Sequence, residues 1–283
     1  MSAAFSGFDH VLVGTRDLEE ARRQFERLGF ATTPLGRHRG WGTGNRCILF
    51  EHGYVELMGI LDREKFVNGI DRFIDRGEGL MGLAWAVEDG AAALERLCAN
   101  GIAAERSEEI VRLIEDPAGE RLPRFRTVGW PEEDSPALWT FIVEHLTPEL
   151  EREPAWVEHP NGALGLAALT VVVEDPNGLT AAYSRLVAGA AVSVADGAVS
   201  IVSNGQRLSF VAPEALARFH AGLAPEGAKA SPRQAVLTIP VAELDRTREV
   251  LNAGKIGFGD LGDVLRVRPD LACGVWLEFS AAA

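Results

Sequence analysis

The chain has 283 residues, 47% of them hydrophobic, and a formal net charge of −13 at pH 7. A chain of this length and apolar content can bury a large core, and we expect two domains. The acidic balance argues against nucleic-acid binding, and no apolar run approaches the roughly 20 residues that span a bilayer.

The first predicted unit is a strand, a helix and three further strands within residues 8–58. The opening strand carries His10, and the closing strand carries Glu56. The helix between them ends at Gly29. Its apolar residues are spaced by three or four, as on one face of a helix: Leu18, Ala21, Phe25 and Leu28.

The same order of elements recurs three times, with a period of roughly 60 to 70 residues. The three later units begin with predicted strands at residues 81–89, 166–175 and 235–241. In the second unit we expect a charge-rich loop between the end of its helix at residues 100–101 and the strand at residues 125–128. Three of the four units pass from strand to helix through an aspartate, which caps free N–H groups and complements the helix dipole: Asp17, Asp89 and Asp175. We therefore predict an α+β protein of four βαβββ modules.

A segment rich in proline and charge, residues 147–162, separates the second and third units. It ends in Asn161-Gly162, a strong turn signal. We predict an N-terminal domain of residues 1–150 and a C-terminal domain of residues 163–283, each built from two modules.

The sequence resembles the vicinal oxygen chelate superfamily of glyoxalases, bleomycin-resistance proteins and extradiol dioxygenases, and most closely its glyoxalase-like branch. The resemblance is densest over residues 8–60, extends to about 165, and is architectural beyond that point. The segments that carry it are residues 9–13, 17–18, 28–30, 40–46, 54–57, 141–145, 147–148 and 159–163.

This resemblance implies that two modules face each other in a cupped mixed sheet, with metal ligands on the first and last strand of each module. The first module then supplies His10 and Glu56. In the second module Gly82 stands opposite His10, so that ligand is missing, and Glu144 stands opposite Glu56. In the C-terminal half Ala168 takes the histidine position and only Glu278 remains a candidate, so we expect a degenerate site there.

A metal site of His10, Glu56 and Glu144 would suit zinc, nickel, manganese or iron, with Glu56 and Glu144 as the catalytic residues. The alternative is that His10 is an ordinary core histidine, that Glu56 pairs with an arginine, and that no metal binds. Because neighbouring strand residues point to opposite faces, His145 would replace Glu144 if the strand were turned over.

The glycine-rich loop of residues 40–46 offers substrate-binding candidates. Trp41, Asn45 and Arg46 would line the mouth of the cup, with Arg46 holding a carboxylate. A hairpin loop with a packed tryptophan is the alternative. Of the other histidines, we expect His38 and His52 in exposed loops, His159 in a structural turn, and His220 without an acidic partner.

The leading hypothesis is a divalent-metal-dependent lyase, isomerase or dioxygenase acting on a small oxygenated molecule. The alternative is a metal-free small-molecule binder of the drug-sequestering kind, and a third is a degenerate scaffold that acts through dimerisation. No secretory signal is visible, and three widely spaced cysteines suit a reducing cytoplasm. We expect a small-molecule ligand, no nucleic-acid or membrane partner, and a homodimer as one option.

Overall fold

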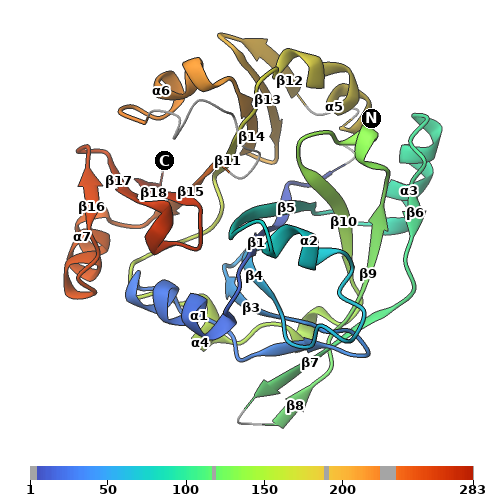
Figure 1. Ribbon diagram of the computed structural model, residues 1–283, viewed down its shortest axis with the longest axis horizontal. Helices are drawn as coiled ribbons and strands as arrows, with labels where there is room; N and C mark the ends of the chain where they lie inside the picture. The colour runs from blue at the N-terminus through green and yellow to red at the C-terminus, as the bar shows by residue number, and fades with distance from the viewer. Residues whose placement is uncertain (1–4, 117–118, 188–190, 224–233, 283) are drawn as a thin grey trace.

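The computed structural model describes residues 5–116, 119–187, 191–223 and 234–282. Its strands form two mixed sheets, one of strands β1 to β10 and one of strands β11 to β18. Figure 1 shows the first sheet curled into a barrel and the second lying open beside it. The prediction of an α+β fold with paired modules and cupped sheets is confirmed.

The first module follows the predicted order of elements. These are β1 (Phe8–Gly14), α1 (Leu18–Arg27), β2 (Gly36–His38), β3 (Thr43–Leu49) and β4 (Tyr54–Ile60). Asp17 caps α1 as predicted, because its carboxylate accepts hydrogen bonds from the N–H groups of Glu19 at 2.9 Å and Glu20 at 3.0 Å. The buried residues of α1 are those of the predicted apolar stripe.

The second module is longer than predicted, because the charged segment expected to be a loop forms additional strands. A short helix, α2 (Ile70–Ile74), leads into it. The module comprises β5 (Gly79–Trp85), α3 (Gly90–Ala99), β6 (Glu105–Arg106), β7 (Ile110–Asp116), β8 (Gly119–Arg121), β9 (Arg124–Gly129) and β10 (Trp139–His145). Strand β7 pairs with both β2 and β9, and this double pairing closes the barrel.

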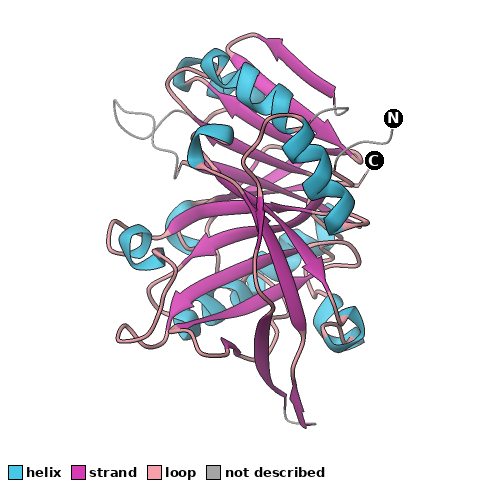
Figure 2. Cartoon of the chain, turned by 90° about the vertical axis from the view of Figure 1, so that its right-hand side faces the viewer, coloured by secondary structure: helices cyan, strands magenta, loops and turns pink. Residues whose placement is uncertain are grey.

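The second sheet stays open, with β12 and β16 at its edges. Its third module comprises β11 (Ala168–Val172), α5 (Thr180–Leu186), β12 (Ala191–Ala195), β13 (Ala198–Ser203) and β14 (Gln206–Val211), followed by α6 (Leu216–Phe219). The fourth comprises β15 (Ala235–Val241), α7 (Leu244–Ala253), β16 (Phe258–Asp260), β17 (Val264–Val267) and β18 (Trp276–Ala281). Figure 2 shows the helices flanking the strands of both sheets.

The segment between the two sheets holds them together. It contains the helix α4 (Pro154–Val157) and the turn at residues 159–162. The ring of His159 bonds the carbonyl of Leu49 at 2.9 Å and the N–H of Ala31 at 3.0 Å, which confirms the structural role predicted for this histidine. The rings of Phe30 and Phe279 stack 5.8 Å apart, so the core is continuous across the two sheets.

No helix within the described ranges is both long and apolar enough to cross a membrane.

Candidate active site

The interior of the barrel holds a cavity of about 270 Å³. The apolar part of its walls combines aliphatic side chains with five aromatic ones: Trp41, Tyr54, Phe125, Trp139 and Phe141. Its polar lining includes the side chains of His10, His38, Asn45, Glu56 and Arg112. A concave, mostly apolar space with a few convergent polar groups is the usual form of a small-molecule site.

His10 and Glu56 meet inside this cavity because strands β1 and β4 run parallel. The register places His10 opposite Tyr54, and Glu56 lies two residues further along β4 on the same face. His10 Nε2 lies 3.3 Å from Glu56 Oε2, and both residues are buried. Asn45 on β3 donates to Glu56 Oε1 at 2.5 Å, and the Tyr54 ring stacks on the His10 ring at 4.4 Å.

A chain of polar contacts runs from this pair toward the barrel wall, and we refer to Glu56, His10, Asp9, His145 and Glu151 as the polar chain. Asp9 Oδ1 lies 2.6 Å from His10 Nδ1, and Asp9 Oδ2 lies 2.8 Å from His145 Nε2. His145 Nδ1 then contacts Glu151 Oε2 at 2.7 Å. The ladder between β1 and β5 shifts register at Asp9, and such a bulge re-aims side chains, which explains how neighbours in a strand come into contact.

Hydrogen bonds and charges within the polar chain shift the pKa values of Glu56, His10 and His145. Burial alone would raise the pKa of Glu56, but the hydrogen bond and charge of His10 lower it to about 2. Burial alone would lower the pKa of His10, but hydrogen bonds to Asp9 and Glu56 raise it above its ordinary value. For His145, burial is likewise outweighed by Asp9 and Glu151, which raise its pKa to about 10. At neutral pH His145 is therefore an imidazolium beside the ionised carboxylate of Asp9.

The raised pKa of His145 predicts a stability that depends on pH. Because the folded pKa of about 10 exceeds the ordinary value of 6.5, the pairing stabilises the fold fully below pH 6.5 and is lost as pH rises through about 10. Urea unfolding of wild type and His145→Gln should differ most at pH 6 and converge toward pH 10. NMR of the ring should still show imidazolium at about pH 8, and titration near 6.5 would contradict this assignment.

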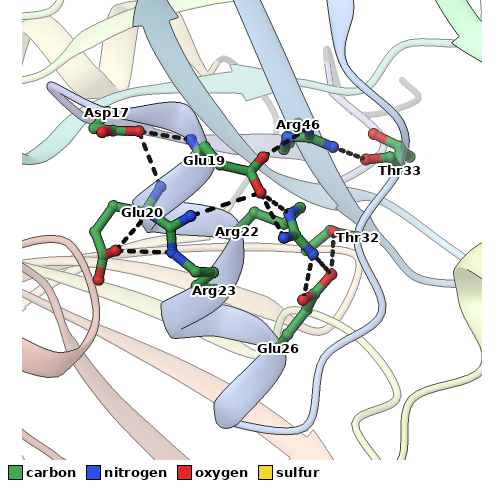
Figure 3. Close-up of polar contacts among 9 residues, drawn as sticks. All are labelled: Asp17, Glu19, Glu20, Arg22, Arg23, Glu26, Thr32, Thr33 and Arg46. Atoms are coloured by element: carbon green, nitrogen blue, oxygen red, sulfur yellow. Dashed lines mark hydrogen bonds and ion pairs between the residues drawn. The ribbon is translucent and has the colours of Figure 1, made fainter.

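Of the three substrate-binding residues predicted from the glycine-rich loop, two line the cavity and one does not. Trp41 and Asn45 line the cavity. Arg46 does not, because its guanidinium lies on the outside of the barrel against helix α1. There it contacts Glu19 Oε2 at 3.0 Å and the carbonyl of Thr33 at 3.1 Å, as Figure 3 shows.

Glu144 also lies apart from His10 and Glu56. Residues Trp139, Phe141 and Val143 of β10 line the cavity, so the alternation of the strand directs Glu144 to the outer face. There its carboxylate pairs with Arg106, and its side chain lies near Gly90 of helix α3. His145, the predicted replacement, is not among the cavity-lining residues and contacts Asp9 instead.

The glyoxalase-like domain family matches residues 8–187 of the chain, which include the whole barrel. The protein belongs to the glyoxalase-like family. This family lies within the superfamily that the sequence resembles, so the resemblance is confirmed. No curated protein matches the sequence.

Solved structures share the fold of this glyoxalase-like protein across nearly its whole length. A hypothetical protein from Staphylococcus aureus matches with a TM-score of 0.71 and 11% identity, covering 97% of this chain and 99% of that one. A xylose isomerase-like TIM barrel/4-hydroxyphenylpyruvate dioxygenase fusion protein matches with a TM-score of 0.61 and 14% identity, over 100% of this chain and 50% of that one. A mutant 4-hydroxymandelate synthase from Streptomyces coelicolor matches with a TM-score of 0.57 and 12% identity, over 99% and 94%.

The donor set in the barrel of this glyoxalase-like protein does not fit the predicted three-residue metal centre. Within the described part of the chain, no three side chains of His, Cys, Asp or Glu are arranged to hold a metal ion. His10 and Glu56 are adjacent, but both nitrogens of His10 already contact carboxylates, and Glu144 is directed away. A zinc site ordinarily needs at least three protein ligands, and two are present here.

Sequence reasoning missed most of the aromatic wall of the cavity and two of its basic residues. Arg112 was hidden in the charged segment taken for a loop, and nothing local in the sequence signals that β7 bridges β2 and β9. His38 was expected to be exposed, but it lies on β2, lines the cavity and bonds Thr43 Oγ1 at 2.8 Å. Burial lowers its pKa to about 4, so it is neutral.

The C-terminal sheet has a buried ionic cluster where a degenerate site was expected. Glu278 on β18 contacts His220 Nδ1 at 2.8 Å, and Arg266 Nε donates to the same carboxylate at 2.7 Å. His220 Nε2 also lies 2.9 Å from Thr170 Oγ1. The prediction that His220 has no acidic partner is therefore wrong, because its partner lies far away in the sequence.

Proposed function

We propose that this glyoxalase-like protein binds a small, flat, largely apolar molecule inside its N-terminal barrel, and that binding is its function. The observation that carries the proposal is the cavity itself, which a closed barrel encloses and aromatic rings line. Aromatic walls bury large apolar area and favour stacked or edge-on contacts with a ligand ring. Trp139 and Phe141 already stack on each other at 4.7 Å along one wall.

The electrostatics of the polar chain favour binding over proton transfer. An efficient general base has a pKa near the working pH. The pKa of Glu56 is about 2, far below neutral pH, so this carboxylate is not matched to that task. The contacts of Glu56 with Asn45 and of His10 with Asp9 instead hold the polar surface of the cavity in place, so that it can orient a ligand.

A second cavity, of about 520 Å³, adjoins the first and offers a way in. The two share Asn68, Ile70 and Trp139 in their lining. Trp139 is 42% exposed although it also lines the inner cavity, so it stands at the mouth. The short helix α2, which begins at Ile70, contributes to the walls of both cavities.

A second candidate function is divalent-metal-dependent lyase, isomerase or dioxygenase chemistry. It is favoured by the contact between His10 and Glu56, which the first and last strands of the first module bring together. The dioxygenase and synthase named among the structural neighbours share this fold. Elemental analysis of protein purified without chelator tests this candidate. Near-stoichiometric zinc, nickel, manganese or iron that is lost in the His10→Ala, Glu56→Ala double variant would support it. Absence of metal from the wild type would contradict it.

Filling the cavity should abolish binding without unfolding the protein. Gly129 lines the cavity on β9, two residues beyond Thr127 on the same face, and a Cβ there would meet open space. In Gly129→Leu the added side chain should occupy the ligand volume. Small aromatic compounds that raise the Tm of wild type in the presence of chelator should then have no effect on the variant.

The matched control is Gly259→Leu, at an exposed position on edge strand β16 where a Cβ also meets open space. It should keep the ligand-induced rise in Tm. If Gly129→Leu responds to the compounds as wild type does, the ligand site lies elsewhere.

A further inference from the structure

Arg112 is a buried cation in the wall of the ligand cavity. It lies on β7, the strand that closes the barrel, and only 4% of the residue is exposed. Its guanidinium lies over the Phe125 ring, 5.1 Å from the centroid. Nη1 lies 3.4 Å from Cys47 Sγ, and Nε has no hydrogen-bond partner.

The hydrogen-bonding capacity of this group is largely unused. A guanidinium has five N–H donors, and sulfur is a weak acceptor. Across the described ranges no carboxylate oxygen lies within 4.0 Å of Arg112, whereas the buried Arg266 of the second sheet donates to Glu278 at 2.7 Å. A buried N–H donor without an acceptor is costly, so an acceptor from outside the chain would stabilise the guanidinium of Arg112.

The nearby acidic groups do not supply that acceptor. Glu56 and Glu151 act on Arg112 only at longer range. Glu56 is already engaged by His10 and Asn45, and Glu151 by His145. These carboxylates also limit the charge that a ligand can bring, because a dianion would be repelled more strongly than a monoanion.

We infer that the cavity binds a monocarboxylate on an aromatic body, with the carboxylate paired to Arg112 and the ring against Trp139 and Phe141. This inference rests on the proposed function and specifies its ligand class. The planar fork of an arginine matches the two oxygens of a carboxylate. The neutral ring of His38, in the same lining, adds hydrogen-bonding capacity without adding charge.

The test compares phenylacetate with phenylacetamide, which has nearly the same shape and no charge. Titration by calorimetry at neutral pH should show wild type binding phenylacetate at least about tenfold more tightly, as expected for a charge-assisted hydrogen bond. In Arg112→Met this preference should vanish, while the affinity for phenylacetamide should stay within about twofold of wild type. Arg124→Met, at an exposed arginine on the adjacent strand β9, should keep the preference.

Folding of the variant is checked independently. Replacing an unpaired buried cation with an apolar side chain of similar length should leave Tm unchanged or raise it. If Arg112→Met fails to fold, Arg112→Lys provides the second test, because it keeps the charge but loses the planar fork, and it should retain only part of the preference.

The outcomes separate the two proposals. Equal binding of both probes to wild type would overturn the carboxylate inference and leave the proposed function standing. Tighter binding of phenyl phosphate than of phenylacetate would also overturn it. Binding of neither probe would contradict the proposed function together with the inference.

Discussion

Replacing Asp9 with alanine should lower the free energy of unfolding by about 3–5 kcal/mol, the range for removing one partner of a buried ion pair. Asp9 is the central carboxylate of the polar chain and contacts His10 at 2.6 Å and His145 at 2.8 Å. Its removal leaves the buried ring of His10 and the half-buried ring of His145 each without one of its carboxylate partners. Urea unfolding measured by circular dichroism gives the free energy directly.

The free energy of unfolding lost in Asp9→Ala should depend on pH, and the pKa shifts determine the direction of that dependence. The histidine pKa values are raised above 6.5 in the fold and that of Asp9 is lowered below 3.8. The interaction therefore stabilises the fold fully between these two values, and its contribution falls as pH rises toward the folded pKa of His145, about 10. A loss of stability that grew as pH rose from 6.5 to about 10 would contradict the charged pairing of Asp9 with His145.

Two further variants control for shape and for surface charge. Asp9→Asn keeps the volume and removes the charge, and it should recover only part of the lost stability. Asp75→Ala breaks a pair with Arg63 in which both side chains are 59% exposed, and it should change stability little, because exposed ion pairs contribute little.

Replacing Asn161 with alanine should lower the free energy of unfolding by about 2–4 kcal/mol, because two buried backbone groups lose their partners. Asn161 is fully buried in the segment that joins the two sheets. Its Nδ2 donates to the carbonyl of Leu28 at 2.9 Å, and its Oδ1 accepts from the N–H of Ala163 at 3.0 Å. The side chain thereby ties helix α1 of the first sheet to the chain entering the second.

Calorimetric unfolding of Asn161→Ala is compared with Asn252→Ala, at an exposed position on helix α7 where alanine favours the helix. The Tm of Asn161→Ala should fall clearly below that of wild type, and the Tm of Asn252→Ala should not. Equal Tm values would show that the buried amide contributes nothing to the junction between the sheets.

The sequence was sufficient to predict the modules because their signals are local. Apolar spacing defines α1, Asp17 caps it, and Gly29 follows its end with φ of 84°. The contact of His10 with Glu56 also follows from the module, since its first and last strands pair in parallel.

The rest of the site depends on register and on pairings between distant strands. The strand carrying Glu144 was predicted correctly, but its alternation was not, and a shift of one residue reverses the face. Arg112 enters the cavity only because β7 bridges two distant strands, and Asp9 reaches His10 only through a bulge. Such long-range features have no local signature in a single sequence.

The central claim is that the N-terminal barrel binds a small aromatic molecule. It is tested most directly by NMR chemical-shift mapping of the isotopically labelled, chelator-treated protein during titration with phenylacetate. We predict saturable shifts at the indole N–H of Trp139 and at Phe141 and Arg112, with the strands of the second sheet unaffected. Shifts confined to the second sheet, or no saturable shift in the barrel, would contradict the account.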